Sequence, residues 1–370
     1  MDKYYLAALT SAFTYLPAAN LWELLSRFGS AKNVFSADWT ELEATGLVKP
    51  NLLKRYKERH RPNLPDDIAN YCHIHAVKLV DFTDEKYPFP LRHIFNPPPV
   101  LYVKGKLPES KCFLAMVGSR KATSYGLVVA RDFAKALADK GIIIVSGGAY
   151  GIDTASHQGA LESSGSTIAV IGSGFDNVYP ASNTKMFRQI QERGAVITEF
   201  SPDIEPFSHH FPLRNRIIAG ICSGILVVEA AQKSGAIITA RIASEEGRDV
   251  YAIPGDITAG NSKGTNSLIQ DGAKLISSPE DILEEYKLLP VAEKKKKPKV
   301  QIDSLFNLLP GKPEKDTERV LKTISSHRSV TIDELVVYLG LPVQRLAGLL
   351  LNLQMHGVIS QDTGNRYRCN

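Results

Sequence analysis

The stretch Phe113-Leu-Ala-Met-Val117 is the first of six short apolar runs in the middle of this 370-residue chain. The other five are Ile142-Ile-Ile-Val145, Thr167-Ile-Ala-Val-Ile171, Ala195-Val-Ile-Thr198, Ile225-Leu-Val-Val228 and Val250-Tyr-Ala-Ile253. Continuous apolar runs of this length are typical of strands buried on both faces, as in a parallel sheet. Helical stretches such as Leu127–Leu137 lie between most of them. This alternation predicts an α/β fold with a doubly wound, mostly parallel, Rossmann-like sheet over residues 111–288.

Three of the runs end in small, glycine-rich turns: Gly118-Ser119-Arg120, Ser146-Gly147-Gly148 and Gly172-Ser173-Gly174. In a doubly wound sheet, ligands bind at the carboxyl ends of the strands, where helix N-termini present free amides. Gly118 lets the backbone approach a phosphate, Ser119 adds a hydroxyl, and Arg120 can make a two-pronged contact. One such turn also suits strand-to-helix geometry on steric grounds alone. Three in succession favour an anion-binding groove along one edge of the sheet.

Two more arginines follow in the stretch Phe211-Pro-Leu-Arg214-Asn215-Arg216. If Pro212 opens the next helix, both lie in its first turn, where a cation costs about 0.3–1 kcal/mol unless an anion compensates. Their position therefore predicts phosphate binding. The alternative is an internal ion pair with a nearby acidic residue: Glu199, Asp203 or Glu205. Phe211 is either a core residue or a platform for base stacking, and the sequence leaves both open.

The remaining polar residues of this region do not form a recognisable catalytic or metal site. Glu229 precedes the polar turn Lys233-Ser234-Gly235, and we expect it to order this loop by accepting amide hydrogen bonds. Asp153 and His157 are spaced i, i+4, but no third metal ligand accompanies them, so capping and packing is the favoured interpretation. No Ser–His–Asp grouping or Walker lysine motif is present, and the turn after Gly118 departs from the dinucleotide fingerprint. We predict no catalytic residue, metal or cofactor.

Net charge does not explain an anion site in the middle of the chain. The whole chain has a formal net charge of +5, yet residues 112–285 contain 15 Lys and Arg against 19 Asp and Glu. Residues 294–370, by contrast, contain 13 Lys and Arg against 7 Asp and Glu. An anion site in the middle must therefore be built locally, from backbone amides and a few arginines.

The cysteines and the apolar runs indicate in which cellular compartment the protein is found. The four cysteines lie far apart and form no CxxC pair, so we expect neither a metal site nor a disulfide framework. The longest apolar runs, such as Gly141–Val145, are too short to span a membrane. Residues Met1–Tyr5 lack the basic and apolar pattern of a signal peptide. We expect a cytoplasmic protein without a membrane partner.

The N-terminal part has a different sequence pattern from the middle of the chain. Residues 1–62 show short helical patterns interrupted at Phe28-Gly29 and Thr45-Gly46-Leu47. A helix, a glycine-centred turn and a second helix resemble a helix-hairpin-helix or SAM-like module, and a plain helical cap on the next domain is the alternative. Residues 63–110 are rich in proline and aromatic residues, which predicts an extended connector that finishes in a strand.

The C-terminal part begins with a charged tether. Residues 289–312 include Lys294–Lys297 and are predicted to be a linker. Residues 313–370 contain three helical patterns, of which one opens at Thr331 and another at Pro342, followed by a closing β-hairpin. This order predicts a winged-helix domain.

The motifs of the middle region, taken together, resemble one protein family. They are Val117-Gly-Ser-Arg120, Ser146-Gly-Gly-Ala-Tyr-Gly-Ile-Asp153, Ala155-Ser-His157, Tyr179-Pro180 with Asn183, Phe211-Pro-Leu-Arg-Asn-Arg216, Glu229-Ala with Lys233-Ser-Gly235, Ile253-Pro-Gly255 and Gly264-Thr-Asn-Ser-Leu-Ile269. Over residues 80–280 this series resembles the DNA-processing protein A family, DprA, also called Smf. The resemblance implies a dimeric protein without enzymatic activity that binds and protects single-stranded DNA in natural transformation. It also implies competition with single-strand binding protein and loading of RecA recombinase.

The resemblance also implies which residues line the strand groove. Carried over position by position, they are Gly118, Ser119, Arg120, Ser146, Gly147, Gly148, Phe211, Arg214, Asn215 and Arg216. Lys233 and Ser234 lie on the same rim and are included as DNA-binding candidates. Many relatives place a lysine just before the Phe-Pro motif or just after Tyr-Pro, where this chain has Ser208 and Ala181. We predict Lys185 as the substitute for that cation.

Two other functions compete with this interpretation. Related Rossmann-like phosphoribohydrolases hydrolyse nucleotides with a glycine-rich catalytic loop, which the comparable stretch Glu229–Gly235 lacks. In the second alternative, the winged helix is the main binder and prefers duplex DNA, while the central domain senses a nucleotide.

Overall fold

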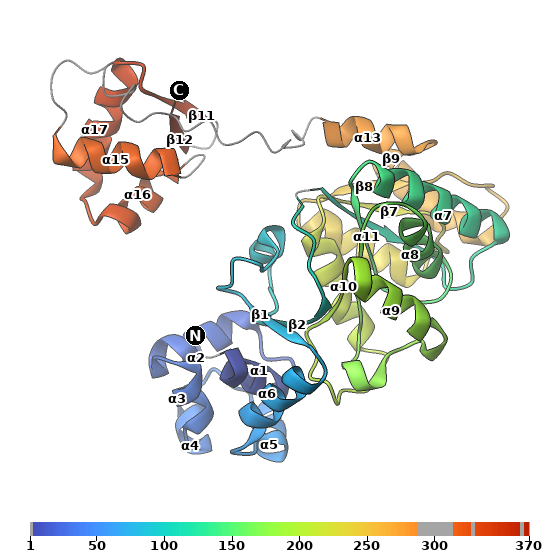
Figure 1. Ribbon diagram of the computed structural model, residues 1–370, viewed down its shortest axis with the longest axis horizontal. Coiled ribbons are helices and arrows are strands. Elements are labelled where there is room, and N and C mark those ends of the chain that lie inside the picture. The colour runs from blue at the N-terminus through green and yellow to red at the C-terminus, as the bar shows by residue number, and fades with distance from the viewer. Residues whose placement is uncertain (1–2, 111, 288–313, 327–329, 363–365, 370) are drawn as a thin grey trace. The chain divides into compact units, whose positions relative to one another are not determined.

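The chain folds into two compact units, Met1–Val291 and Ala292–Asn370. The structure is a computed structural model that describes residues 3–110, 112–287, 314–326, 330–362 and 366–369 (Figure 1). The linker that we predict over 289–312 lies outside these ranges. No helix within them is long and apolar enough to cross a membrane.

The first unit is built on one nine-stranded sheet with the order β1-β2-β6-β5-β4-β3-β7-β8-β9. The strands are β1 Lys78–Asp81, β2 Val100–Gly105, β3 Phe113–Val117, β4 Ile143–Ser146, β5 Thr167–Val170, β6 Ala195–Thr198, β7 Gly224–Val227, β8 Asp249–Ala252 and β9 Lys274–Leu275. Neighbours from β6 to β9 run parallel, whereas β2 is antiparallel to both β1 and β6. Strands β3 to β7 are buried along their whole length, which explains their continuous apolar sequences. The predicted α/β, mostly parallel, Rossmann-like fold is confirmed.

Helices cover both faces of this sheet. They are α7 Ser124–Asp139, α8 Ile152–Glu162, α9 Thr184–Arg193, α10 His210–Ile221, α11 Gly235–Glu245, α12 Lys263–Gln270 and α13 Pro279–Lys287. Leu114 and Met116 of β3 share a core cluster with α7, α8 and α13, whereas Ala115 and Val117 share another with α10 and α11. Alternate residues of a strand point to opposite faces, so each strand serves both cores. The loops after the parallel strands therefore leave the sheet along one edge, between the two helical layers.

The N-terminal residues form five helices. They are α1 Lys3–Ala12, α2 Ala18–Phe28, α3 Ala31–Ser36, α4 Trp39–Ala44 and α5 Pro50–Arg59. The two helix breaks predicted from the sequence are confirmed, because α2 ends before Gly29 with φ of 80° and α4 ends shortly before Gly46 with φ of 69°.

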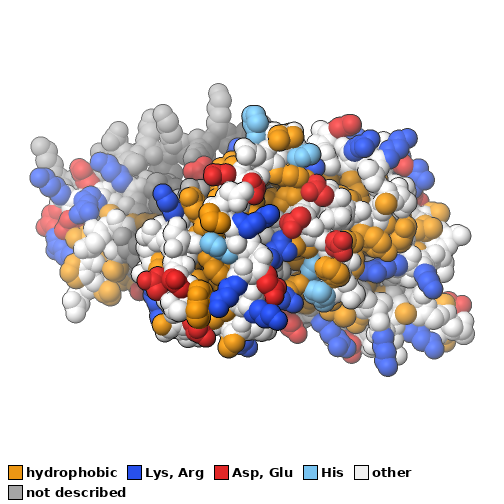
Figure 2. Space-filling model, turned by 90° about the horizontal axis from the view of Figure 1, so that it is seen from below, with side chains coloured by type: hydrophobic (Ala, Val, Ile, Leu, Met, Phe, Trp, Pro, Cys, Tyr) orange, Lys and Arg blue, Asp and Glu red, His pale blue; other side chains and the backbone are white. Residues whose placement is uncertain are grey.

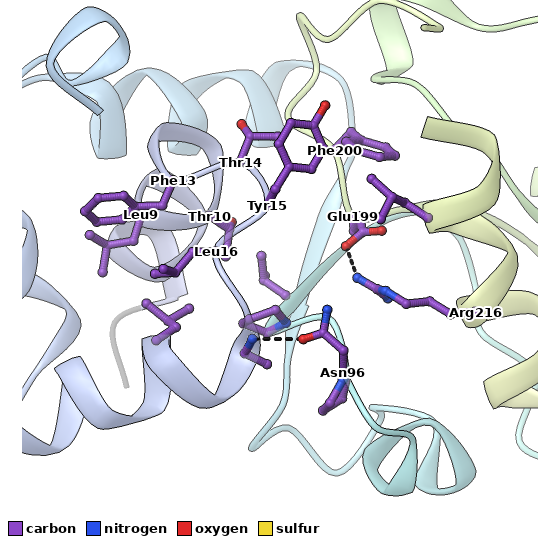
Figure 3. A pocket seen from close by; sticks show the side chains of 16 residues that line it. Leu9, Thr10, Phe13, Thr14, Tyr15, Leu16, Asn96, Glu199, Phe200 and Arg216 are labelled. Atoms are coloured by element: carbon purple, nitrogen blue, oxygen red, sulfur yellow. Dashed lines mark hydrogen bonds and ion pairs between the residues drawn. The ribbon is translucent and has the colours of Figure 1, made fainter. Parts of the chain in front are cut away.

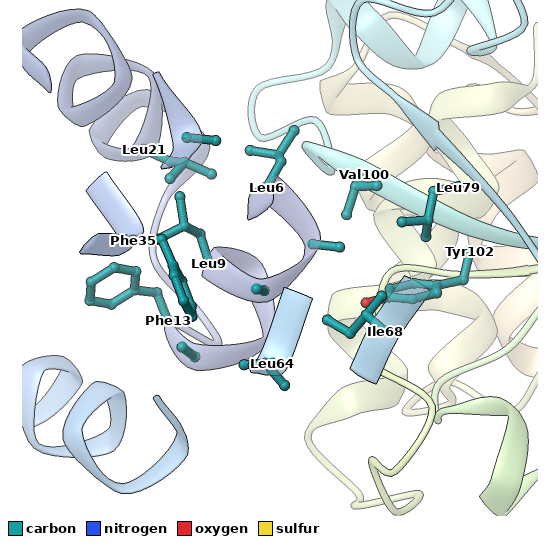
Figure 4. Packing of buried hydrophobic residues seen from close by; sticks show 14 of the residues in the cluster. Leu6, Leu9, Phe13, Leu21, Phe35, Leu64, Ile68, Leu79, Val100 and Tyr102 are labelled. Carbon is teal, nitrogen blue, oxygen red and sulfur yellow. The ribbon is translucent and has the colours of Figure 1, made fainter. Parts of the chain in front are cut away.

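These helices share one hydrophobic core with the edge of the sheet (Figure 4). Leu6 and Leu9 of α1 are fully buried, and Phe13 stacks on Tyr56 of α5 with ring centroids 4.3 Å apart. The same cluster includes Val100 and Tyr102 of β2. The N-terminal helices are thus packed on the sheet domain, as the alternative of a helical cap requires.

The stretch 63–110 contains more regular structure than the extended connector that we predict. It forms α6 Leu64–Ile74, the sheet strands β1 and β2, and the short helix η1 Phe89–His93. Only its end, the strand β2, matches the expectation. The proline and aromatic content of this stretch did not predict that β1 and β2 pair in the sheet. These strands are stabilised by contacts with β6 and the N-terminal helices, which are distant in the sequence.

The second unit has its own small core and a three-stranded sheet with the order β10-β12-β11. Its elements are α15 Lys315–Ser326, β10 Val330–Thr331, α16 Ile332–Leu339, α17 Val343–Met355, β11 Ile359–Asp362 and β12 Arg366–Cys369. Thr331 caps α16 and forms a capping box with Glu334, while Pro342 immediately precedes α17. The predicted winged-helix domain and its hairpin are confirmed.

Candidate nucleic-acid interface

The glycine turns after β3 and β4 lie in direct contact at the carboxyl edge of the sheet. The Ile152 amide at the start of α8 donates to the Ser119 carbonyl at 3.2 Å. A Cβ on Gly118 would lie 2.5 Å from Cγ1 of Ile152 and 2.8 Å from the Glu229 carbonyl oxygen. Gly151, with φ of 75°, approaches the Ser119 carbonyl too closely for any Cβ. These two turns therefore meet at the carboxyl edge of the sheet, and close packing requires glycine at positions 118 and 151.

Glu229 is the buried carboxylate that holds the first turn in place. It is 5% exposed and accepts hydrogen bonds from the Thr123 amide, at 2.9 Å, and from the Thr123 hydroxyl. Thr123 in turn caps α7 by accepting from the Gly126 amide at 3.1 Å. The ordering role predicted for Glu229 is observed, but it acts on the loop after β3 rather than on the turn at Lys233.

Arg214 lies beneath the second turn. Its side chain is only 4% exposed, and its guanidinium donates to the carbonyls of Gly147, at 2.7 Å, and Val170. Burial lowers its pKa to about 10, against the opposing influence of Asp153. Asp153 accepts from the amides of Gly147 and Ala149, and burial raises its pKa. Arg214 therefore supports the turn from within the protein.

Arg216 faces a different part of the molecule. It forms an ion pair with Glu199, and both side chains are largely buried, at 16% and 17% exposure. The pair lines a pocket of about 120 Å³ together with Tyr15 of the N-terminal region and Phe200. Figure 3 shows these four side chains. Burial raises the pKa of Glu199, and the Arg216 charge opposes this shift. Of the two alternatives that the sequence left open, the internal ion pair is the one observed.

The prediction that both arginines lie in a first turn opened by Pro212 is wrong. Helix α10 begins at His210, so Arg214 is its fifth residue and Arg216 its seventh. Two positions on a helix differ by about 200° in direction when they are two residues apart. This explains why one guanidinium reaches the glycine turns and the other the N-terminal helices. Arg120, Arg214 and Arg216 consequently do not converge on one surface patch.

Arg120 remains on the exposed rim. Its guanidinium carbon lies 4.9 Å from the ring centroid of Phe211. Phe211 is half-buried, and a Cβ on Gly172 would lie 3.2 Å from its Cδ1 atom. Phe211 thus connects the first and third glycine turns and keeps part of its surface exposed. The structure thus brings Arg120 and Phe211 together on this rim, and the guanidinium carbon of the buried Arg214 lies 6.0 Å from the same ring centroid.

The other predicted site residues divide into three groups. The Ser146 hydroxyl is buried and donates to the Met116 carbonyl at 2.6 Å, while Asn215 accepts from Nε of Arg214 at 3.2 Å. Lys185, in the first turn of α9, and Lys233, in the loop before α11, are exposed. Ser234 is the N-cap residue of α11, and its hydroxyl is buried with no partner among the described residues. Among the residues that the structure describes, Lys185, Lys233 and Ser234 make no hydrogen bond or ring contact with Arg120 or Phe211.

Asp153 and His157 show the packing role favoured from the sequence. The His157 ring is fully buried, and its Nδ1 atom lies 2.8 Å from the Thr167 hydroxyl. Burial and, to a lesser degree, the Arg214 charge lower its pKa to about 3. Within the described ranges, no three His, Cys, Asp or Glu residues gather as a metal site.

Sequence reasoning missed two aromatic residues on this rim, Tyr150 and Tyr179. Their side chains are 45% and 40% exposed, and Tyr179 lies 5.8 Å from Phe211 between ring centroids. Each occupies a motif used for the family resemblance, so an aromatic residue in a glycine- or proline-containing turn was the available signal. Figure 2 shows Lys and Arg interspersed with Asp and Glu on the face drawn, in line with a locally built site.

The fold defines a Rossmann-like protein with a winged-helix domain. Comparison with known proteins places it more narrowly. The family model described as DNA recombination-mediator protein A matches residues 78–287, and the DprA winged helix domain model matches residues 308–365. The chain belongs to the DNA-processing protein A family, DprA or Smf.

Individual relatives support the same assignment. The DNA processing protein DprA of Streptococcus pneumoniae is 46% identical over 204 residues, which cover 55% of this chain and 72% of the relative. That of Bacillus subtilis is 39% identical over 240 residues, with 64% and 80% covered. The X-ray structure of the S. pneumoniae protein aligns with a TM-score of 0.64 at 35% identity, covering 76% of this chain and 97% of the other. A Helicobacter pylori structure, whose description refers to a single-stranded DNA binding mode, aligns with a TM-score of 0.52 at 28% identity, covering 58% and 95%.

Proposed function

We propose that this protein binds single-stranded DNA along the carboxyl edge of its sheet and acts as a recombination mediator. The observation that carries the proposal is the exposed Arg120 guanidinium over the ring of Phe211, beside the packed glycine turns. A cation beside an aromatic face offers a contact for a phosphate and a surface for a base. The single-strand binding mode attributed to the H. pylori relative supports the choice of ligand.

The contacts described above divide the predicted site residues by role. We propose that Gly118, Ser119, Arg120 and Phe211 contact the strand. Lys185 and Lys233 remain proposed phosphate contacts at its periphery, because both are exposed. We propose that Ser146, Gly147, Gly148, Arg214 and Asn215 shape the turns, and we retain Ser234 only as a candidate. Arg216 is withdrawn from the strand path, because it pairs with Glu199 at the N-terminal helices.

The binding proposal is tested with the full-length protein and labelled oligothymidine in a fluorescence anisotropy titration. We expect tighter binding of the single strand than of a duplex of the same length at the same salt concentration. A preference for the duplex would instead favour the winged-helix domain as the main binder. Failure to bind either ligand would contradict the proposal as a whole.

We further propose that the protein is a cytoplasmic homodimer that displaces single-strand binding protein and loads RecA during natural transformation. Membership of a family described as recombination mediators supports this role. The test measures RecA ATP hydrolysis on DNA precoated with single-strand binding protein, with and without this protein. We expect faster onset of hydrolysis with it, and an unchanged lag would contradict the loading role. Analytical ultracentrifugation tests the dimer.

We also propose that the protein performs no chemistry on the strand. Glu229 begins the loop that is comparable to the catalytic loop of the phosphoribohydrolases. Its carboxylate is buried and accepts hydrogen bonds from Thr123. The test incubates the protein with nucleoside monophosphates and measures the free base. Turnover would favour the phosphoribohydrolase alternative, and we expect none.

A further inference from the structure

Three aromatic rings form a row on the rim that carries Arg120. The ring centroids of Tyr150 and Tyr179 are 6.2 Å apart, and those of Tyr179 and Phe211 are 5.8 Å apart. Arg120 lies over the ring at the Phe211 end. Arg120 also lines a groove together with Tyr150, which lies at the other end of the row. The row therefore runs from Phe211, beside the proposed phosphate contact Arg120, to the groove that Tyr150 lines.

This groove has a volume of about 640 Å³ and runs between α7 and α8. Its apolar lining comes from both helices, and two of its side chains, Leu127 and Val128, are 38% and 57% exposed. The charged side chains among its lining residues are all cations: Arg120, Lys121 and Arg131. Arg131 is paired with Glu162, whereas Arg120 and Lys121 have no ion pair among the described residues. An apolar wall beside cations suits a ligand that has a flat apolar part and a negative charge.

Tyr150 lines the groove from a turn whose backbone is anchored on both sides. It lies between Gly148 and Gly151, whose φ angles are 65° and 75°. The Ala149 amide donates to the buried Asp153 carboxylate at 3.3 Å, so the backbone on one side of Tyr150 is anchored. On the other side, Gly151 packs against the Ser119 carbonyl. An exposed ring on an anchored turn loses little conformational freedom when a ligand stacks on it.

We infer that the α7/α8 groove accepts a nucleobase of the bound single strand, stacked on Tyr150, while Arg120 and Lys121 contact the flanking phosphates. This inference rests on the proposed function and extends its strand path beyond Arg120 and Phe211. Because stacking uses the ring face that every base possesses, the contact is tolerant of sequence. Tyr179, between Tyr150 and Phe211, keeps the row continuous.

The test compares the full-length wild type with Tyr150→Ala and Tyr150→Phe in binding to labelled oligothymidine. Loss of one stacked base costs about 1–3 kcal/mol, so we expect Tyr150→Ala to weaken binding by about 5- to 150-fold. Tyr150→Phe keeps the ring and is expected to bind like the wild type. The salt dependence should be the same for all three, because the ring carries no charge.

An oligonucleotide with abasic positions tests whether the ring contacts a base. Removal of bases should weaken binding by the wild type and have a smaller effect on Tyr150→Ala, which has already lost the stacking contact. The matched control is Phe89→Ala, a change at a 71% exposed aromatic residue on η1, which should bind like the wild type. Photo-crosslinking of the wild type to 5-iododeoxyuridine DNA should label the peptide that contains Tyr150.

The outcomes separate this inference from the proposed function. If the wild type binds oligothymidine but Tyr150→Ala binds equally well, or if crosslinks avoid the Tyr150 peptide, the groove inference is overturned and the strand-binding proposal stands. Equal weakening in Tyr150→Ala and Tyr150→Phe would also overturn it, since the hydroxyl rather than the ring would then be responsible. Absence of binding by the wild type would overturn the proposed function itself.

Discussion

The guanidinium of Arg120 lies 4.9 Å from the ring centroid of Phe211, although Arg120 lies in the loop after β3 and Phe211 lies in α10, 91 positions later in the sequence. The pair is exposed enough to meet a ligand, and Phe211 is fixed from behind by the glycine turn at Gly172. This arrangement distinguishes Arg120 from Arg214 and Arg216, which have partners inside the protein.

Replacement of Arg120 tests the phosphate contact directly. We expect Arg120→Ala to weaken binding of every single-stranded sequence tested. The slope of log affinity against log salt should fall by about 0.7, the value for one lost contact to a single strand. Arg27→Ala is the control, because it removes an exposed arginine from α2. Unchanged affinity of Arg120→Ala would remove this residue from the site.

Replacement of Arg216 separates a structural arginine from a DNA-binding one. We expect Arg216→Ala to leave the salt slope of single-strand binding unchanged, because this guanidinium pairs with Glu199. The variant should instead lower the free energy of unfolding, because Glu199 would remain largely buried without its cation. Urea denaturation and anisotropy titrations measure the two effects. A slope reduced as far as that of Arg120→Ala would restore Arg216 to the strand path.

Arg214 is expected to be the arginine on which stability depends most. Arg214→Ala leaves the Gly147 and Val170 carbonyls without their donor and Asp153 without its nearby cation. Breaking a buried charged network in this way costs about 3–5 kcal/mol. Urea denaturation should show this loss, whereas Arg241→Ala, a change at an exposed residue of α11, should shift the unfolding free energy by less than about 0.5 kcal/mol. Similar unfolding midpoints for the two variants would refute the supporting role of Arg214.

The buried His157 predicts a pH dependence of stability. Its pKa is lowered to about 3 in the folded protein, while an unfolded histidine titrates near 6.5. The unfolded state therefore binds a proton first as the pH falls, and stability is lost between about pH 6.5 and pH 3. From this group alone, the loss between pH 7 and pH 5 is about 2 kcal/mol.

The contribution of His157 is measured by the difference between two proteins. Urea denaturation at both pH values should show a weaker pH dependence for His157→Asn than for the wild type. Carbon-13 NMR of the wild-type imidazole should show a neutral ring at pH 5. A ring that titrates near pH 6.5 in the folded protein would contradict the assignment.

Local sequence patterns were sufficient for the positions of strands β3 to β8 and of the glycine turns that follow β3, β4 and β5. The run at Phe113–Val117 is apolar throughout because both faces of this strand are covered. Burial of both faces requires consecutive apolar residues, which can be recognised in the sequence. The glycines at 118 and 151 are likewise required by neighbouring atoms: the Ile152 side chain and the Glu229 carbonyl crowd Gly118, and the Ser119 carbonyl crowds Gly151. Strand β1 has a weaker sequence pattern, because its position at the edge of the sheet depends on contacts with helices distant in the sequence.

The sequence by itself determined the parallel sheet, its glycine-lined carboxyl edge and the family of the chain, since these depend on residue types at fixed local spacing. Only the tertiary structure decided what each arginine does. Helical geometry directs Arg214 and Arg216 to different neighbours, and long-range contacts supply the carbonyls and the carboxylate that occupy them. Arg120 remains exposed, and the fold places the ring of Phe211 beside it.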